Sequence, residues 1–178
     1  MSRPLLVIVG GAPGAGKTTI ARELAHRLHL AIITKDDVKE ALGDALGVGD
    51  RQRSRELGGA AYAVMWSVAR RALEAGAGLV LEANFYREIS EPRLAELATL
   101  ADAVVVLCRA DARVRRRRYE SRHDRHAVHT DAVILADEWR EDDAINAIDV
   151  GVPRLVVDTT SGYDADAIVS WITRTSTT

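Results

Sequence analysis

Short apolar runs alternate with amphipathic stretches along almost the whole chain. The runs lie at residues 5–9, 31–34, 79–83, 103–108 and 155–158. Most of them lack the regular alternation of apolar and polar residues that marks a half-exposed strand, and this is typical of strands buried on both faces of a parallel sheet. We therefore predict about five strands in one mainly parallel sheet.

The stretches between these runs have helical periodicity. Ile20, Leu24 and Leu28 recur every four residues and give residues 19–29 one apolar stripe. Further helices are predicted at residues 38–46, over a long stretch that ends at Gly76, from Pro92 onward, at residues 113–122 and 132–140, and at the end of the chain. The predicted apolar face of the long helix consists of Leu57, Ala61, Val64, Val68 and Ala72.

This alternation of strands and helices predicts an α/β fold, because parallel neighbours need the crossover connections that helices provide. Helices are expected on both faces of the sheet, and ligands beyond the carboxyl ends of the strands. A chain of 178 residues has the length of one domain. Without a repeat or a linker, residues 1–178 are expected to form a single domain.

Charge and cysteine content limit the possible partners and compartment. The formal net charge of −2 provides no global attraction to nucleic acid or to anionic membranes, so anion binding has to come from locally clustered arginines. The single cysteine, Cys108, cannot form an intramolecular disulfide. No apolar stretch approaches the roughly 20 residues of a membrane helix, and the chain start does not resemble a signal peptide. We expect a cytoplasmic protein with no membrane partner.

The first predicted turn carries the strongest motif. Residues 11–18 satisfy the Walker A pattern in full, and they lie between a predicted strand and a predicted helix, as that pattern requires. Its glycines let the backbone amides turn toward a phosphate, and the helix N-terminus adds positive potential. Lys17 is expected to reach the β- and γ-phosphates of ATP, and Thr18 to ligate Mg²⁺. The predicted nucleotide-binding residues are Gly11, Ala12, Pro13, Gly14, Ala15, Gly16, Lys17, Thr18 and Thr19.

Two other classes of P-loop protein fit the sequence less well. A motor or oligomeric ATPase would carry an apolar strand that ends in Asp, whereas residues 103–108 end without an acid. Residues 34–37, Thr-Lys-Asp-Asp, resemble the guanine-specifying motif of GTPases. In GTPases that motif lies far downstream, but here it closely follows the first helix, where small-molecule kinases place substrate-binding and catalytic acids.

Together these segments resemble the small P-loop kinases, a family that includes polynucleotide kinase, shikimate and gluconate kinases, chloramphenicol phosphotransferase and zeta-toxin-like kinases. The resemblance is closest to the subgroup of predicted ATP-binding kinases with Lys-Asp-Asp after the second strand. It covers the Walker A loop, residues 35–39 and 81–85, an arginine-rich helix, and residues 156–160, which resemble a loop beside adenine. It implies a P-loop NTPase fold with an arginine-rich lid, and ATP and Mg²⁺ as cofactors.

The resemblance also suggests roles for polar residues outside the loop. The first Asp of a matching segment in polynucleotide kinase is the general base, so the resemblance implies this role for Asp36. The chemistry agrees, because a carboxylate beside the phosphates can accept the proton of an attacking hydroxyl. Asp37 is instead expected to cap the next helix. Lys39 matches a substrate-contacting arginine, with simple solvation as the alternative. Glu82 stands where relatives often have an Asp near the metal or the substrate, and Asn84 is a candidate substrate contact or a turn residue.

An arginine-rich lid is expected at residues 113–131. Residues 113–122 contain six arginines, and in relatives a lid after the fourth strand brings arginines over the nucleotide phosphates. Arg118 and Arg122 are the catalytic candidates and Arg125 a further nucleotide-binding candidate, with a solvated basic face as the alternative. Three histidines recur every three residues in the same segment: His123, His126 and His129. Since no cysteine accompanies them, a structural or phosphate-contacting role is favoured over a metal site.

The sequence thus predicts an ATP-dependent kinase that moves the γ-phosphate to a hydroxyl of a small metabolite or antibiotic. The predicted catalytic set is Lys17, Asp36, Arg118 and Arg122. Two alternatives stay open. One is a polynucleotide 5′-hydroxyl kinase, which the aromatic content of 4% weakly disfavours because base stacking needs aromatic side chains. The other is a switch protein that hydrolyses ATP without an acceptor and would need neither a base nor a lid.

Overall fold

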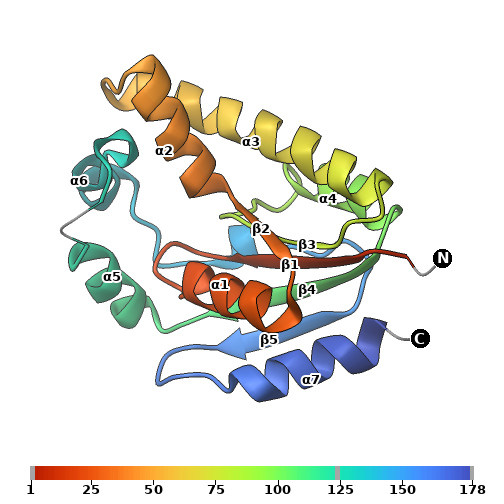
Figure 1. The fold of residues 1–178 in the computed structure, drawn as a ribbon. Helices are drawn as coiled ribbons and strands as arrows, with labels where there is room; N and C mark the ends of the chain where they lie inside the picture. Colours follow the sequence, from red (N-terminus) through yellow and green to blue (C-terminus); the bar gives the residue numbers. More distant parts are fainter. Residues whose placement is uncertain (1–2, 123–124, 177–178) are drawn as a thin grey trace.

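Five parallel strands form the centre of the structure (Figure 1). They are β1 (Leu5–Gly11), β2 (Ala31–Thr34), β3 (Leu79–Glu82), β4 (Asp102–Arg109) and β5 (Arg154–Asp158), in the order β2-β3-β1-β4-β5. This computed structural model describes residues 3–122 and 125–176, without the side chain of residue 137. Every strand pair in the sheet is parallel, which confirms the predicted α/β fold.

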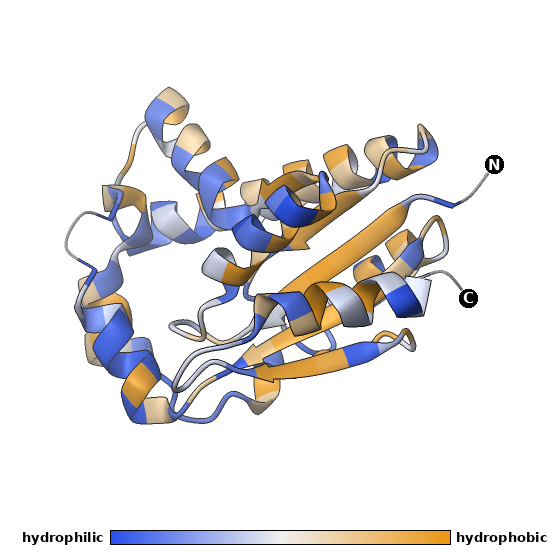
Figure 2. Cartoon of the chain, turned by 60° about the horizontal axis from the view of Figure 1, so that its bottom comes forward, coloured by the Kyte–Doolittle hydropathy of each residue, from blue (hydrophilic) through white to orange (hydrophobic). Residues whose placement is uncertain are grey.

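Helices cover both faces of this sheet. The long helices are α1 (Lys17–Leu28), α2 (Lys35–Leu46), α3 (Arg51–Glu74), α4 (Glu91–Ala98), α5 (Ala112–Glu120) and α7 (Ala165–Ser176). The short ones are η1 (Ala127–His129), α6 (Asp131–Val133), η2 (Ile134–Glu138) and η3 (Ala144–Asn146). Figure 2 shows predominantly hydrophobic strands flanked by helices that carry both hydrophobic and hydrophilic residues. Over the described residues, no helix combines the length and the apolar character that crossing a membrane requires.

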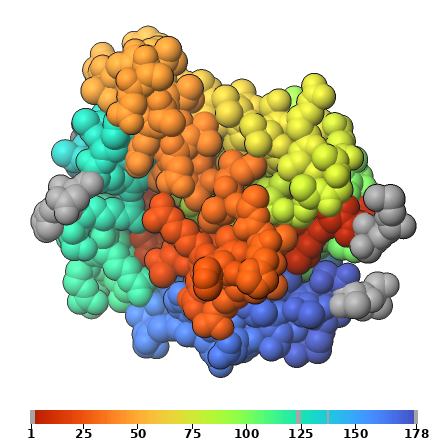
Figure 3. All heavy atoms as spheres, viewed as in Figure 1, coloured from red at the N-terminus to blue at the C-terminus, as the bar shows by residue number. Residues whose placement is uncertain are grey.

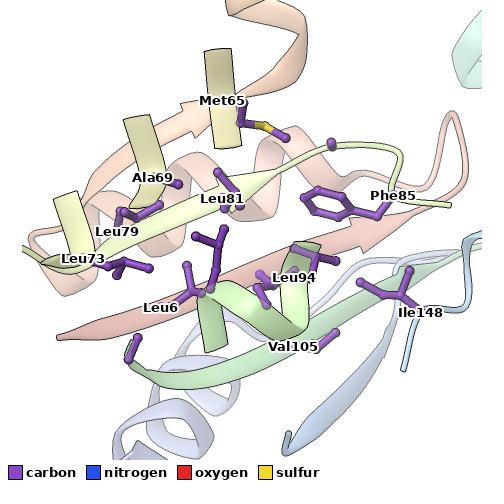
Figure 4. Packing of buried hydrophobic residues seen from close by; sticks show 14 of the residues in the cluster. Leu6, Met65, Ala69, Leu73, Leu79, Leu81, Phe85, Leu94, Val105 and Ile148 are labelled. Carbon is purple, nitrogen blue, oxygen red and sulfur yellow. The ribbon is translucent and has the colours of Figure 1, made fainter. Parts of the chain in front are cut away.

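The apolar residues of β1 are divided between two cores. Leu6 and Ile8 pack with residues of α3 and α4 on one face of the sheet, as Figure 4 shows for Leu6, Met65 and Leu94. Their neighbours Val7 and Val9 pack with α1 and α7 on the other face. Because successive side chains of a strand point to opposite faces, a strand covered on both sides needs an uninterrupted apolar run. This is the physical basis of the pattern at residues 5–9.

The predicted apolar face of α3 is wrong at two of its five positions. Leu57 and Ala61 are buried as predicted, but Val64 and Val68 are exposed. The buried positions continue instead at a constant spacing of four residues: Met65, Ala69 and Leu73. A spacing of four advances faster than the 3.6 residues of a helical turn, so the buried stripe winds around this 24-residue helix. The predicted spacing, which included a step of three, followed a straighter stripe.

Two other predictions of local structure are also wrong. Helix α2 begins at Lys35 rather than residue 38, and its N-cap is Thr34, whose hydroxyl accepts a hydrogen bond from the Asp37 amide at 3.0 Å. Asp37 therefore lies inside the first turn and is not the cap, because Thr34 already fills that role. The helix predicted at residues 132–140 is shorter: the α-helical turn α6 continues as the wide turn η2 and ends at Glu138.

Replacing Leu81 with alanine should destabilise the protein strongly. Leu81 is fully buried in β3, and removing its side chain would leave a cavity between the sheet and α3. We expect a loss of about 2–5 kcal/mol in the free energy of unfolding, measured by chemical denaturation. The matched control is Leu46→Ala, because Leu46 is 59% exposed. Equal effects of the two substitutions would contradict the assigned core.

Candidate active site

A cavity of about 840 Å³ lies at the carboxyl ends of the strands, where the loop after β1, helix α2 and the lid meet. It is lined by Ala12, Pro13, Lys17 and Thr18 of the Walker A loop and by Lys35, Asp36, Lys39 and Glu40 of α2. The lining continues at the end of β3 with Glu82, Ala83 and Asn84. From the lid it includes Arg115, Arg122, Arg125 and His129. Figure 3 shows the teal lid segment packed beside the orange helix α2. Sequence positions more than 100 residues apart therefore share one cavity.

The Walker A loop has the backbone conformation of a phosphate cradle. Gly14 and Gly16 both have φ of +79°, in the left-handed region that favours glycine. A Cβ atom on Gly14 would lie 2.4 Å from the carbonyl oxygen of Arg115, so this glycine also allows α5 to approach the loop closely. Successive amides in such a loop, together with the N-terminus of α1, provide donors and positive potential for an anion.

Lys17 is the buried cation of this loop. Its ammonium group donates a hydrogen bond to the carbonyl oxygen of Ala12 at 2.9 Å, and its side chain is buried. Burial lowers the pKa of Lys17, although Glu82 and Asp36 act in the opposite direction. An anion bound in the cradle would restore the preference for the charged form.

Thr18 and Glu82 bring two oxygen groups together beside the loop. The Thr18 hydroxyl donates to a carboxylate oxygen of Glu82 at 3.3 Å. Burial raises the pKa of Glu82, and the neighbouring Lys17 only partly offsets this effect. Neighbouring oxygen groups of this kind suit a hard divalent cation, which would stabilise the ionised carboxylate.

Asp36 lies in the first turn of α2 with two cations beside its carboxylate. Lys35 contacts one oxygen at 3.2 Å, and Arg125 of the lid donates to the other at 2.6 Å. Burial alone would raise the pKa of Asp36, but Lys35, Arg125 and His129 outweigh burial and hold that pKa well below its usual range. The carboxylate is therefore ionised across the physiological pH range.

The lid is attached to α2 by three acid–base pairs. Three acidic residues follow one another at intervals of four along one face of α2, and each meets a basic residue of the lid. The pairs are Asp36 with Arg125 at 2.6 Å, Glu40 with His129 at 2.7 Å and Asp44 with His126 at 3.0 Å. His126 and His129 thus serve as contacts between the lid and α2, while His123 lies outside the described residues.

The lid arginines point to different places. Arg122 lines the cavity, with its guanidinium 4.9 Å from the ring centre of Tyr119. Arg118 lies outside the cavity lining and donates to the carbonyl oxygen of Thr159 at 2.6 Å and to that of Gly14 at 3.4 Å. Thr19 is exposed on α1 and does not line the cavity either. The cavity lining thus includes ten of the predicted site residues. It leaves out Arg118, Thr19 and four residues of the Walker A loop: Gly11, Gly14, Ala15 and Gly16.

Lys39 is buried, and this differs from the solvated alternative considered for it. Only 4% of the residue is exposed, and its ammonium group donates to the hydroxyl of Ser54 on α3 at 2.7 Å. The Ser54 hydroxyl in turn donates to the carbonyl oxygen of Val128 in the lid. These two hydrogen bonds connect α2, α3 and the lid on one side of the cavity.

Several residues that line the cavity were not identified from the sequence. They are Arg51, Arg55, Tyr86, Arg115, Tyr119, Glu138 and Trp139. Arg51 and Arg55 lie one turn apart at the start of α3, and both contact the carboxylate of Glu138. A basic pair four residues apart directly after a glycine-containing turn was the available signal for these two. Arg115 belongs to the arginine-rich run at residues 113–122 but was not singled out within it. Nothing in the local sequence marks the remaining four, because their places depend on tertiary packing.

Known proteins share both the sequence pattern and the fold. The AAA domain family profile matches residues 6–139. A shikimate kinase from Corynebacterium efficiens is 46% identical over 48 residues, which span 26% of this chain and 28% of that protein. A protein from Chloroflexus aurantiacus j-10-fl, described as a candidate kinase, aligns over 97% of this chain and 98% of its own with 33% identity and a TM-score of 0.85. The APS kinase of Mycobacterium tuberculosis has the same fold, with 16% identity, a TM-score of 0.59 and full coverage of both chains.

Proposed function

Because the chain belongs to the AAA-domain family of P-loop kinases, we propose that it transfers the γ-phosphoryl group of ATP to a hydroxyl group of a small molecule. The main support is a single cavity that is lined both by the phosphate loop and by Asp36. Its volume of about 840 Å³ lies in the range of small-ligand sites. Relatives named shikimate kinase and APS kinase are consistent with a small acceptor.

In the proposed reaction, the acceptor oxygen forms a bond to the γ-phosphorus while the bond from that phosphorus to the β–γ bridging oxygen breaks. ADP leaves with the bridging oxygen, and the hydroxyl proton passes to Asp36. The low pKa of Asp36 keeps its carboxylate ionised, so it can orient the hydroxyl and accept the proton as the new bond forms. This suits phosphoryl transfer, whose loose transition state needs positioning more than strong deprotonation.

The cations around the cavity have separate tasks in this proposal. Lys17 holds the β- and γ-phosphates, and Arg122 stabilises the charge on the transferring group. Arg125 pairs with Asp36 in this structure. The acceptor hydroxyl has to replace Arg125 at the carboxylate, and this releases the guanidinium toward the phosphates. Arg118 positions the loop against Thr159 rather than touching the reacting atoms.

Thr18 and Glu82 are the residues that would hold Mg²⁺. They offer two oxygen groups beside the phosphate loop, and the raised pKa of the buried Glu82 carboxylate indicates a place where a cation is favourable. When bound, Mg²⁺ would neutralise charge on the phosphates of ATP. The long side chain of Glu82 reaches the Thr18 hydroxyl from the end of β3.

Replacing Thr18 with valine should weaken Mg²⁺-dependent nucleotide binding. The substitution keeps the shape of the side chain but removes the hydroxyl oxygen. We expect a loss of about 10- to 100-fold in apparent Mg²⁺ affinity, measured by calorimetric titration of a non-hydrolysable ATP analogue at varied Mg²⁺. Thr99→Val is the control, since Thr99 is exposed at the end of α4. Unchanged Mg²⁺ dependence in Thr18→Val would refute the assignment.

An acceptor screen tests the proposed function directly. ADP release would be followed without an acceptor and with neutral sugars, small alcohols, hydroxy acids, phosphorylated sugars or a 5′-hydroxyl oligonucleotide. We expect one small-molecule class to stimulate ADP release strongly and to acquire the phosphate. Stimulation by the oligonucleotide alone would indicate a polynucleotide kinase. An equal slow rate in every arm would indicate an ATP-hydrolysing switch.

A further inference from the structure

The ammonium group of Lys39 lacks a carboxylate partner although it is buried. Among the side chains that the structure describes, no carboxylate lies within ion-pair distance of it, and its hydrogen bond is to the neutral Ser54 hydroxyl. An ammonium group has three donors, and this residue lines the cavity. Burying a cation without an anion costs free energy, so such a residue is expected where a ligand supplies the anion.

The residues around Lys39 add positive charge to the same wall. Arg51 and Arg55 both contact Glu138, so two guanidinium groups share one carboxylate. Burial, together with the neighbouring Lys35 and Arg51, lowers the pKa of Lys39 to about 8, although Asp36 acts in the opposite direction. Beside the unpaired ammonium group of Lys39, this wall thus carries two guanidinium groups that share a single carboxylate.

We propose that Lys39 and Arg51 bind an anionic group of the acceptor, so that the acceptor is a hydroxy compound with a carboxylate or a phosphate group. Arg51 lines the cavity and is held in place by Glu138 and by the hydroxyl of Thr130 at 3.3 Å. This inference rests on the proposed function, because it specifies the substrate class of the same site. In this proposal Lys39 determines which acceptors bind, and Asp36 contacts the hydroxyl that reacts.

The spacing on α2 fits a compact hydroxy acid. Lys39 follows Asp36 by three residues, so the two side chains lie on one face of the helix with their Cβ atoms about 5–6 Å apart. A hydroxyl at Asp36 and an anionic group at Lys39 could therefore belong to the same small acceptor. The anion would also restore the charged state of Lys39 that burial disfavours.

The first test compares acceptors that differ in charge alone. Each hydroxy acid, such as gluconate or glycerate, would be assayed against its own primary amide, and each sugar phosphate against its parent sugar. We expect kcat/KM for the charged member to exceed that of the neutral member about 10- to 100-fold, since hydrogen bonds to charged groups are the stronger ones. The two arms distinguish a carboxylate from a phosphate. Equal kcat/KM within every pair would overturn the inference.

The second test uses variants of the cavity wall. Lys39→Gln should raise KM for the charged acceptor about 10- to 100-fold, with kcat and the KM for ATP changed little, and Arg51→Gln should act in the same direction. Arg70→Gln is the control, because Arg70 lies on α3 away from the cavity and pairs with Glu96. A structural role for Lys39 would lower the Tm of the free protein, whereas removal of an unpaired buried charge should leave Tm equal or higher. A lower Tm with an unchanged KM would overturn the inference.

The two proposals fail in different ways. If neutral acceptors are phosphorylated as well as charged ones and Lys39→Gln does not alter their KM, the anion site is wrong while the kinase activity stands. If no acceptor is phosphorylated, the proposed function is wrong, and the anion site is judged by binding alone. Calorimetry would then compare gluconate with gluconamide on protein saturated with Mg²⁺ and a non-hydrolysable ATP analogue. Equal binding of the two compounds would overturn the anion site as well.

Discussion

Asparagine in place of Asp36 should lower kcat about 100- to 10,000-fold, the usual cost of losing a general base. Asparagine keeps the volume of the side chain and its oxygen can still accept a hydrogen bond from Arg125, which donates to Asp36 at 2.6 Å. It cannot take up the proton of the acceptor hydroxyl. ATP affinity should change little, because Asp36 faces the acceptor rather than the triphosphate. Single-turnover transfer and separate ATP titration measure the two effects.

The control for this prediction is the neighbouring acid. Asp37 is exposed and pairs with Arg22 at 3.2 Å, and such surface ion pairs contribute little. Asp37→Asn should therefore alter kcat only a few-fold. If Asp37→Asn were the more damaging change while both variants bound ATP, the base would be misassigned by one residue. If neither change mattered, the proposed mechanism would have to be replaced.

The sheet could be predicted because its strands carry their own signal. A strand covered on both faces needs apolar residues at every position, and β1 meets this condition by sending Leu6 and Ile8 to one core and Val7 and Val9 to the other. The face of α3 could not be read as securely. Several apolar residues lie around this helix, and tertiary packing buries Met65 and leaves Val64 exposed.

The Walker A loop was predictable for a different reason, since all its functional groups lie within eight consecutive residues. The acceptor side depends on contacts between distant segments. Arg125 lies 89 residues from Asp36, and Glu138 lies 87 residues from Arg51. No local pattern determines where the lid returns to α2 and α3, so the sequence identified Arg122 and Arg125 as candidates without indicating their partners.

The burial of Lys39 illustrates the same limit. On a helical wheel it occupies an ordinary polar position, and a lysine there is most often solvated. It is buried because α3 and the lid both pack against this face of α2, through Ser54 and Val128. Such burial follows from tertiary packing alone, and it changes the expected role of the residue from solvation to recognition.

Replacing Lys17 with methionine should lower phosphoryl transfer about 100- to 1,000-fold or more, the range found when one electrostatic stabiliser of a transition state is removed. Methionine keeps the apolar stem, so the change removes chiefly the charge on the β- and γ-phosphates. Burial lowers the pKa of Lys17, which means that the folded protein disfavours this charge in the absence of ATP. The Tm of the free protein should therefore be equal or higher in the variant.

The effect of ATP on Tm completes this prediction. A ligand that binds only the folded state stabilises it by RT ln(1 + [L]/Kd), or about 2.7 kcal/mol at 100 times Kd. Saturating Mg²⁺ and ATP should raise the Tm of the unaltered protein, and Lys17→Met should lose most of this increase because the phosphates no longer meet a cation. Arg70→Gln should keep the increase, since Arg70 lies away from the cavity. A variant with normal transfer and a normal ATP-induced rise in Tm would show that the phosphates do not depend on Lys17.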